Sequence, residues 1–217
     1  VADYTSGLLR SKAPRVGLVR GWFFTEADAE TRLAIEETAQ QMVRAGADLI
    51  EIEMGIDFDR AYSSHRLMQE SEMAVFHEPM YRGNEALYGP KISVYIENGF
   101  RHSAQNYVEA SGYRLECRRL ATAALQNVDA LLIPTASSPA PRDLTQTGDT
   151  RFQSLCSFTG LPSISIPIGL SGTRLPIGAQ FVAPAFEESR LISVANWVEQ
   201  MLGLSLDPWP ASQVDQP

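Results

Sequence analysis

The segment Val128–Pro134, with the sequence VDALLIP, most limits the folds open to this chain. It is almost continuously apolar and ends at a proline. Such a run is typical of a strand buried on both faces of a parallel or mixed sheet, because a strand with one exposed face alternates apolar and polar residues. The segment therefore predicts a mixed sheet covered by helices, which is an α/β fold.

A strand, helix and strand are predicted near the start of the chain. The apolar run at 15–19 predicts the first strand, and the aromatic residues at 21–24 predict a turn after it. Residues 25–28 resemble a capping box, which favours a helix from there to Gly46, where a glycine suits the residue after a helix. Period-two alternation over 49–54 predicts the second strand.

The middle of the chain is predicted to be helical. Residues 57–87 have a helical composition without one clear apolar face, and 93–98 read as a short helix stopped by Gly99. Ser103 suits the start of a long helix that extends to about Gln126. These helices separate the first two strands from the rest of the sheet.

The last third of the chain returns to strands. Residues 135–150 concentrate Pro, Ser, Thr and Gly and predict a loop long enough to favour a functional role. Further strands are predicted at 163–166 and 178–182, and a closing helix at 187–202. Because no linker or repeat interrupts the pattern, we interpret residues 1–217 as one α/β segment.

Charge and cysteine content exclude several classes of protein. Asp and Glu number 26 against 18 Lys and Arg, so the net charge is −8, which disfavours a nucleic-acid partner. No apolar stretch is long enough to span a membrane. The two cysteines are too few for a disulfide framework and suggest reduced thiols. We therefore expect a soluble, cytoplasmic protein with no nucleic-acid or membrane partner.

Common catalytic and cofactor motifs are missing from the sequence. It contains no G-x-S-x-G, P-loop, G-x-G-x-x-G or H-E-x-x-H pattern. His65, His77 and His102 are scattered along the predicted helices without the spacing of a zinc site. We predict neither a metal nor a cofactor.

Three polar sites have both a functional and a structural interpretation. Cys156 could be a nucleophilic thiol or a small buried core residue. Ser137 and Ser138 could be paired reactive hydroxyls or ordinary turn residues before a proline. Asp149 could bind a substrate amine or cap the segment that begins at Thr150. The structural interpretation is favoured at each of them.

Three segments, taken in order, resemble the carboxyl-terminal half of the amidase signature family. They are VDALLIPTASSPAP at 128–141, FTGLPSISIPIG at 158–169 and LPIGAQFVAPAFEESRLI at 175–192. RVGLV, followed by a helix ending in RAGADLIEIEM, is similar to the strand, helix and strand in the middle of that family. The resemblance covers nearly the whole chain.

The resemblance implies amide hydrolysis or transfer by a serine nucleophile, a second serine in a cis peptide and a lysine, without a metal. Those motifs lie upstream of the region that this chain resembles. Lys12 and Lys91 lack a matching context, so no catalytic residue is assigned. This chain also has Ser157 where the family often has Asn.

Within FTGLPSISIPIG, the expected role is structural. Thr159–Gly160 would form a tight turn at a pocket, Ile164 and Ile166 would be buried in the central sheet, and Pro167 would end the strand. We expect this segment to be a scaffold beside chemistry that another part of the enzyme supplies.

Four residues near the ends of predicted strands are candidate substrate-binding residues, because open α/β sheets place ligand crevices there. They are Thr135, Asp149, Ser157 and Phe158. We expect them to cluster on one face.

The predicted function is the carboxyl-terminal portion of an amidase that cleaves carboxylic amides to an acid and ammonia or an amine. Its expected partners are a small amide and the amino-terminal half of the same enzyme, and the isolated chain is expected to be inactive and to self-associate. The alternatives are the A subunit of a tRNA-dependent amidotransferase and a non-catalytic α/β binding module.

Overall fold

The computed structural model describes Tyr4, Leu8, residues 12–141, Asp143 and residues 145–204. Within them, five strands form one mixed sheet in the order β2-β1-β3-β5-β4. β1 is parallel to β2 and β3, whereas β5 is antiparallel to β3 and β4. The α/β prediction is confirmed. The strands are β1 (Arg15–Leu18), β2 (Asp48–Glu51), β3 (Ala130–Pro134), β4 (Ser163–Leu170) and β5 (Pro176–Val182).

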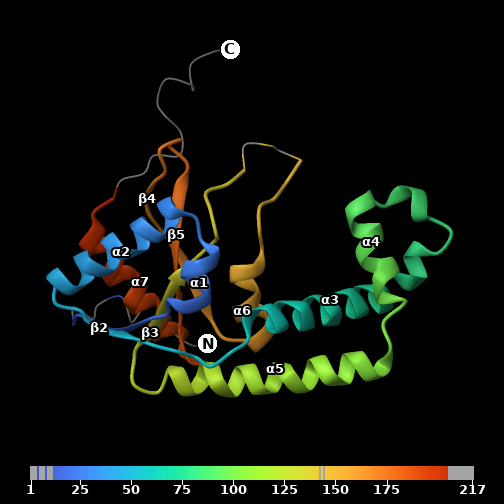
Figure 1. Ribbon diagram of the computed structural model, residues 1–217, viewed down its shortest axis with the longest axis horizontal. Coiled ribbons are helices and arrows are strands. Elements are labelled where there is room, and N and C mark those ends of the chain that lie inside the picture. Colours follow the sequence, from blue (N-terminus) through green and yellow to red (C-terminus); the bar gives the residue numbers. More distant parts are fainter. Residues whose placement is uncertain (1–3, 5–7, 9–11, 142, 144, 205–217) are drawn as a thin grey trace, which may run out of the picture.

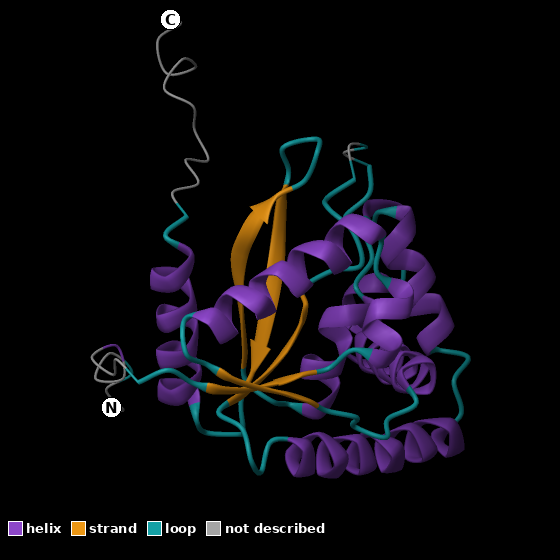
Figure 2. Cartoon of the chain, turned by 60° about the vertical axis from the view of Figure 1, so that its left-hand side comes forward, coloured by secondary structure: helices purple, strands orange, loops and turns teal. Residues whose placement is uncertain are grey.

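The central strand β3 is buried along its whole length, as its apolar sequence predicts. Ala130 and Leu132 pack on one face with residues of α2 (Ala29–Arg44) and α7 (Glu188–Leu202). Leu131 and Ile133 pack on the other face, in a cluster that includes Phe23, Phe152 and Cys117. Helices therefore cover both faces of the sheet (Figure 1 and Figure 2).

The predicted aromatic turn at 21–24 is wrong, because these residues begin a short helix, α1 (Gly21–Glu26). Phe23 is fully buried, and its ring centroid lies 5.1 Å from that of Phe152 in an edge-to-face contact. Phe152, which lies far along the chain, thus packs against α1, and the sequence around residues 21–24 does not reveal this contact.

The start of α2 also differs from the prediction. Thr25 lies inside α1, and Asp28 caps α2 by accepting a hydrogen bond from the Thr31 amide at 2.7 Å. Gly46 follows the helix with a φ of +99°, which confirms its predicted place. β2 ends at Glu51, three residues before the predicted end.

A group of helices extends to one side of the sheet and is called the helical arm. It consists of α3 (Phe58–Tyr81), the short 3-10 helix η2 (Glu85–Leu87), α4 (Pro90–Gly99) and α5 (Ala104–Ala124). α5 runs back along α3 (Figure 1). Ser103 begins α5 as predicted, since its hydroxyl accepts a hydrogen bond from the Asn106 amide at 3.1 Å.

The predicted turn at Thr159–Gly160 is only partly correct. Ser157, Phe158 and Thr159 belong to the last turn of α6 (Arg151–Thr159), which sequence reasoning did not predict. Gly160 ends this helix with a φ of +68°, a conformation that favours glycine.

Pro167 does not end its strand, because β4 continues to Leu170 with an irregularity in pairing between Pro167 and Gly169. β4 lies at the edge of the sheet, where a residue without an N–H is tolerated. Ile166 is buried in the sheet as predicted, whereas Ile164 is only half-buried.

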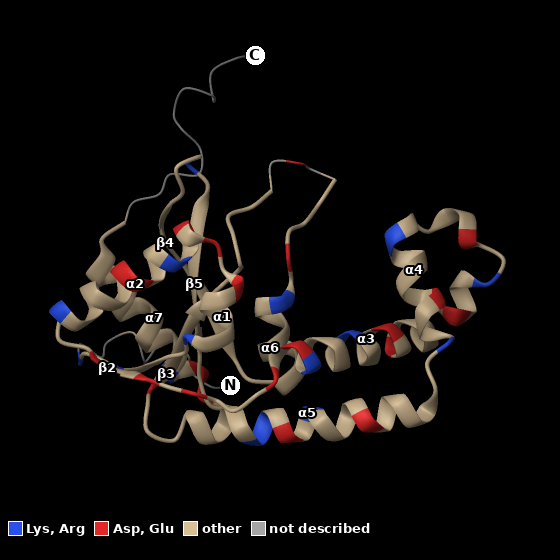
Figure 3. Cartoon of the chain, in the orientation of Figure 1, with Lys and Arg blue, Asp and Glu red and all other residues tan. Residues whose placement is uncertain are grey.

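Charged side chains are spread over the molecule with both signs interspersed (Figure 3). Arg15 pairs with Asp48 at 2.9 Å, and Arg82 pairs with Glu78 at 2.8 Å. None of the helices in the described part of the chain is long and apolar enough to cross a membrane.

Candidate functional site

Two hollows lie at opposite ends of α6. The first, called the arm hollow, has a volume of about 340 Å³ and lies where α3, α5 and α6 meet. Ser157 and Phe158 reach it from the last turn of α6, and the other lining residues come from α3 and α5. The lining residues are His65, Met68, Gln69, Glu72, Met73, Phe76, His77, Arg114, Ser157 and Phe158.

The lining of the arm hollow combines four apolar side chains with six polar or charged ones. Phe158 and Met68 are buried, and the His65 ring lies 5.8 Å from the Phe158 ring. Burial lowers the pKa of His65, and the nearby Glu72 carboxylate opposes this only in part. His65 is therefore neutral near pH 7.

Glu72 and Arg114, which are both exposed, line the arm hollow with one charge of each sign. Glu72 accepts a hydrogen bond from the Tyr107 hydroxyl at 2.8 Å, so part of its hydrogen-bonding capacity is already used. His77 contacts the Tyr88 hydroxyl through Nδ1 at 3.2 Å. The lining therefore offers a ligand both charged and neutral polar contacts.

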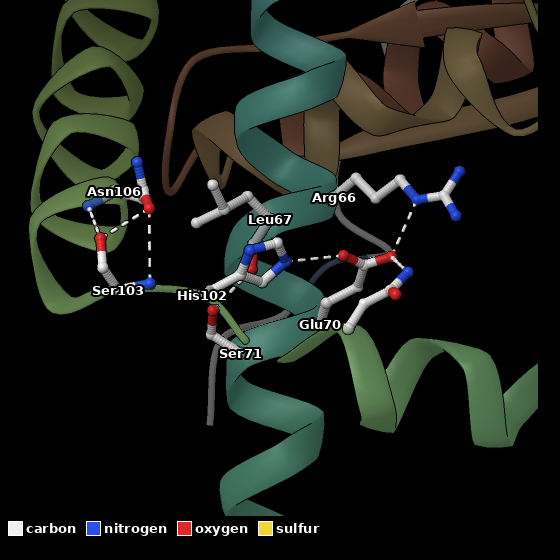
Figure 4. A network of polar contacts seen from close by, with 8 residues as sticks. Arg66, Leu67, Glu70, Ser71, His102, Ser103 and Asn106 are labelled. Atoms are coloured by element: carbon white, nitrogen blue, oxygen red, sulfur yellow. Dashed lines mark hydrogen bonds and ion pairs between the residues drawn. The ribbon is translucent and has the colours of Figure 1, made fainter. Parts of the chain in front are cut away.

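A buried carboxylate near the arm hollow links the helices of the arm to one another. Glu70 of α3 accepts hydrogen bonds from Arg66 Nε at 3.0 Å, Asn98 Nδ2 at 3.1 Å and His102 Nε2 at 2.7 Å. Figure 4 shows His102 and Arg66 converging on this carboxylate. Because Asn98 belongs to α4 and His102 to the following link, these bonds hold both against α3.

The second hollow, called the strand-end hollow, has a volume of about 400 Å³ and lies beyond the end of β3. Thr135, the first residue after β3, bonds through Oγ1 to Ser165 Oγ at 2.6 Å. A Cβ on Gly178 would lie only 2.7 Å from Thr135 Oγ1, so this pair of hydroxyls needs a glycine beside it. Asp149, Thr150 and Gln153 line the same hollow.

Asp149 acts as a cap in this structure, in line with the favoured interpretation. Its Oδ1 accepts the Arg151 backbone N–H at 2.9 Å, and its Oδ2 pairs with Arg151 Nε at 2.7 Å. Arg151 also pairs with Glu26 at 2.8 Å. The carboxylate is thus engaged at the start of α6 before any ligand is considered.

The four candidate substrate-binding residues form two pairs instead of one cluster. Thr135 and Asp149 line the strand-end hollow, and Ser157 and Phe158 line the arm hollow. The prediction places all four near strand ends, whereas Ser157 and Phe158 lie at the end of a helix. Sequence reasoning missed the contributions of α3, notably His65, because that helix lacks a single apolar face.

The other candidate nucleophiles have structural surroundings. Burial raises the pKa of Cys156 to about 11, so its thiol stays protonated and is a poor nucleophile. Ser138 donates a hydrogen bond to the Pro139 carbonyl at 3.2 Å, as expected of a turn. Lys91 donates to the Thr145 carbonyl at 2.6 Å. Among the described residues, no three His, Cys, Asp or Glu side chains gather as a metal site would require.

Comparison with known proteins identifies the family. The sequence profile of the family described as Amidase matches residues 2–192. The A subunit of the glutamyl-tRNA(Gln) amidotransferase of Synechococcus sp. (strain CC9902) is 29% identical, over 92% of this chain and 47% of that protein. An amidase of Pseudomonas putida is 27% identical, over 88% of this chain and 44% of that protein.

Solved structures agree with this result. A crystal structure of an amidase has a TM-score of 0.80 at 21% identity, over 88% of this chain and 46% of that one. A bacterial aryl acylamidase of the amidase signature family has a TM-score of 0.78 at 18% identity, over 92% of this chain and 46% of that one. At such identities the likeness concerns the fold alone.

This chain spans about half the length of the curated relatives it matches. The family profile nevertheless covers most of the chain, and the sheet and helices have the arrangement of the solved enzymes. The chain belongs to the amidase signature family.

Proposed function

We propose that this chain is the carboxyl-terminal portion of a hydrolase that cleaves carboxylic amides to an acid and ammonia or an amine. The observation that carries the proposal is the family match over residues 2–192. The arm hollow supports it, because a concave site lined by both apolar and polar side chains suits a small organic substrate. The chain would supply the scaffold and part of the substrate pocket.

The catalytic groups would come from an amino-terminal portion. An unactivated serine hydroxyl is a weak nucleophile at neutral pH and needs an adjacent base. Lys91 instead bonds to a backbone carbonyl, and the pKa of Cys156 is too high for a thiolate. We therefore expect the isolated chain to bind a substrate weakly and to leave it unhydrolysed.

A second candidate is the A subunit of a tRNA-dependent amidotransferase. The relatives with that name, such as the one from Synechococcus, are among the most similar to this chain. Against it, that subunit typically has a pair of arginines where this chain has GPKISVYIENG, at 89–99. Glutamine-dependent amidation of a charged tRNA by a complemented complex would favour this candidate.

The hydrolase is tested by mixing the purified chain with simple aliphatic and aromatic amides, alone and with a separately expressed amino-terminal half of an amidase. Ammonia or amine release only in the mixture supports the proposal. Robust serine-dependent turnover by the chain alone contradicts its role as a partial enzyme. The absence of any turnover in a mixture that forms a stable complex would favour a non-catalytic binding module.

A further inference from the structure

A groove lies between the second half of α3 and the first half of α5 and is called the arm groove. It has a volume of about 640 Å³, and it shares Glu72 and Phe76 with the neighbouring arm hollow. Eight of its thirteen lining residues are apolar, aromatic or glycine. The largest contributions to this apolar lining come from Val75 and Phe76 of α3, Phe100 of the link before α5, and Tyr107 and Val108 of α5.

Three large apolar side chains of the arm groove are open to water. Val75, Phe76 and Val108 expose 77%, 70% and 68% of their surface, respectively. Contiguous exposed apolar side chains of this kind mark a surface that another molecule covers, because their removal from water is favourable. The arm groove is therefore a candidate docking surface.

The polar side chains of the arm groove already have partners within the chain. Figure 4 shows three of these contacts, made by Ser71, His102 and Ser103. Because its hydrogen-bonding groups are engaged, the groove has little to offer a polar ligand and suits an apolar partner. The five contacts join Ser71 to the Leu67 carbonyl at 2.8 Å, Glu72 to Tyr107 at 2.8 Å, Glu78 to Arg82 at 2.8 Å, His102 to Glu70 at 2.7 Å and Ser103 to the Asn106 amide at 3.1 Å.

Length, shape and charge indicate what covers the groove. This chain spans about half the length of its curated relatives, so a similar length of polypeptide is available in such an enzyme to pack against it. α3 and α5 lie side by side, and the groove between two helices accepts the apolar face of a third. A second copy of this chain fits less well, because two molecules of net charge −8 repel each other.

We propose that the arm groove binds an apolar helix face of the amino-terminal portion of the enzyme. This inference rests on the proposed function, because it names the surface on which that portion docks. Binding would cover Val75, Phe76 and Val108 and leave the internally paired Glu78 at the rim. An interface with an apolar centre and a polar rim is the usual arrangement between proteins.

The probe for this inference is the separately expressed amino-terminal half of the Pseudomonas putida amidase, whose matched portion is 27% identical to this chain. Analytical ultracentrifugation of the whole chain with this probe measures Kd. Val75→Asp and Val108→Asp each place a charge in the groove and should weaken binding at least about tenfold. Neither residue lines the arm hollow, so the candidate substrate pocket stays intact.

Val43→Asp is the matched control, because Val43 is a half-exposed valine of α2 outside the groove. It should leave Kd unchanged, and urea midpoints check that all three variants fold. Equal Kd values for the wild type and both groove variants, or no complex with the wild type, would overturn the inference. A dimer of the chain alone that Val75→Asp abolishes would assign the groove to a second copy and would also overturn it.

Hydrolysis of simple aliphatic and aromatic amides by the mixture separates this inference from the proposed function. Hydrolysis by a complex that forms equally well with Val75→Asp and Val108→Asp would overturn the inference and leave the function supported. A complex that both groove variants weaken, but that hydrolyses none of the amides, would overturn the function and still support docking at the arm groove.

Discussion

The doubly covered sheet and the helical arm bury their apolar residues in different ways. In β3, alternate residues enter two cores, one on each face of the sheet, and every residue is buried. In the arm, α3 contacts α4, α5 and α6 along different stretches. Large apolar residues of the arm therefore stay exposed, among them Val75, Phe76, Leu87 and Val108.

The difference shows how the two regions of this chain divide their roles. β3 is held in place by the two cores that pack against its faces. The sheet therefore acts as a rigid scaffold. α3 contacts α4, α5 and α6, but these contacts do not cover all of its surface. Part of the uncovered surface of α3 lines the arm hollow. We expect substitutions in the sheet to affect folding and substitutions on the exposed arm to affect binding or association.

The same substitution in the two regions should have very different effects. Phe181→Ala, at a fully buried residue of β5, is expected to lower the free energy of unfolding by about 3–5 kcal/mol, because it leaves a cavity in the core. Phe76→Ala, at an exposed residue of α3, should change it by less than about 0.5 kcal/mol. Urea denaturation measures both, and similar losses would contradict the distinction between scaffold and arm.

Alanine substitutions at two glycines of the arm should change the free energy of unfolding in opposite directions. A Cβ on Gly99 would overlap the Glu70 carbonyl oxygen, so Gly99→Ala should separate α4 from α3 and cost up to about 3 kcal/mol. Gly112 lies in α5 with open space around it, and Gly112→Ala should stabilise the helix by about 0.5–1 kcal/mol. Thermal unfolding followed by circular dichroism distinguishes them. A neutral Gly99→Ala variant would show that the close packing of α3 and α4 is unimportant.

Replacing Glu70 should lower the free energy of unfolding measurably, but by less than the Phe181→Ala substitution in the sheet. Its side chain is 5% exposed and is surrounded by donors from Arg66, Asn98 and His102. Glu70→Gln places an amide N–H against those donors and is expected to cost about 1–2 kcal/mol. Glu78→Gln alters only an exposed pair with Arg82 and should cost about 0–1 kcal/mol. Equal losses in the two variants, measured by urea denaturation, would contradict this ranking.

The contribution of Glu70 should depend on pH in one direction. Burial tends to raise the pKa of Glu70, but hydrogen bonds from His102, Asn98 and Arg66 outweigh it and lower the pKa below the usual 4.5. The stabilisation is therefore complete above pH 4.5 and is lost as the pH falls through the folded-state pKa. Urea midpoints measured across this range should fall less steeply in Glu70→Gln. An unchanged acid profile would contradict the role assigned to this carboxylate.

The central strand and several helix ends are predictable from the sequence because their signals are local. The apolar run of β3 indicates a buried strand, the glycine after α2 indicates the end of a helix, and the serine before α5 indicates the start of one. The three strands β3, β4 and β5 also lie in one sheet as predicted. α1 escapes prediction because the burial of Phe23 depends on Phe152, which lies far along the chain.

The candidate site is only partly predictable. The position of Ser157 and Phe158 near a predicted strand end makes them candidate pocket residues, but it reveals neither their helix nor their partners on α3. His65, Met68 and Met73 line one hollow although other residues of α3 contact α4 and α5. A helix with several partners shows no single period, so its sequence does not reveal which residues share a face.

Native-state hydrogen exchange of the isolated chain tests the distinction between scaffold and arm most directly. Amides that open only on global unfolding exchange most slowly. The amides of β3 and β5 are expected to belong to this group, and those of α4 and the second half of α3 to exchange faster through local opening of the arm. Equally slow exchange in arm and sheet would show that the two form one cooperative unit and would contradict the distinction between them.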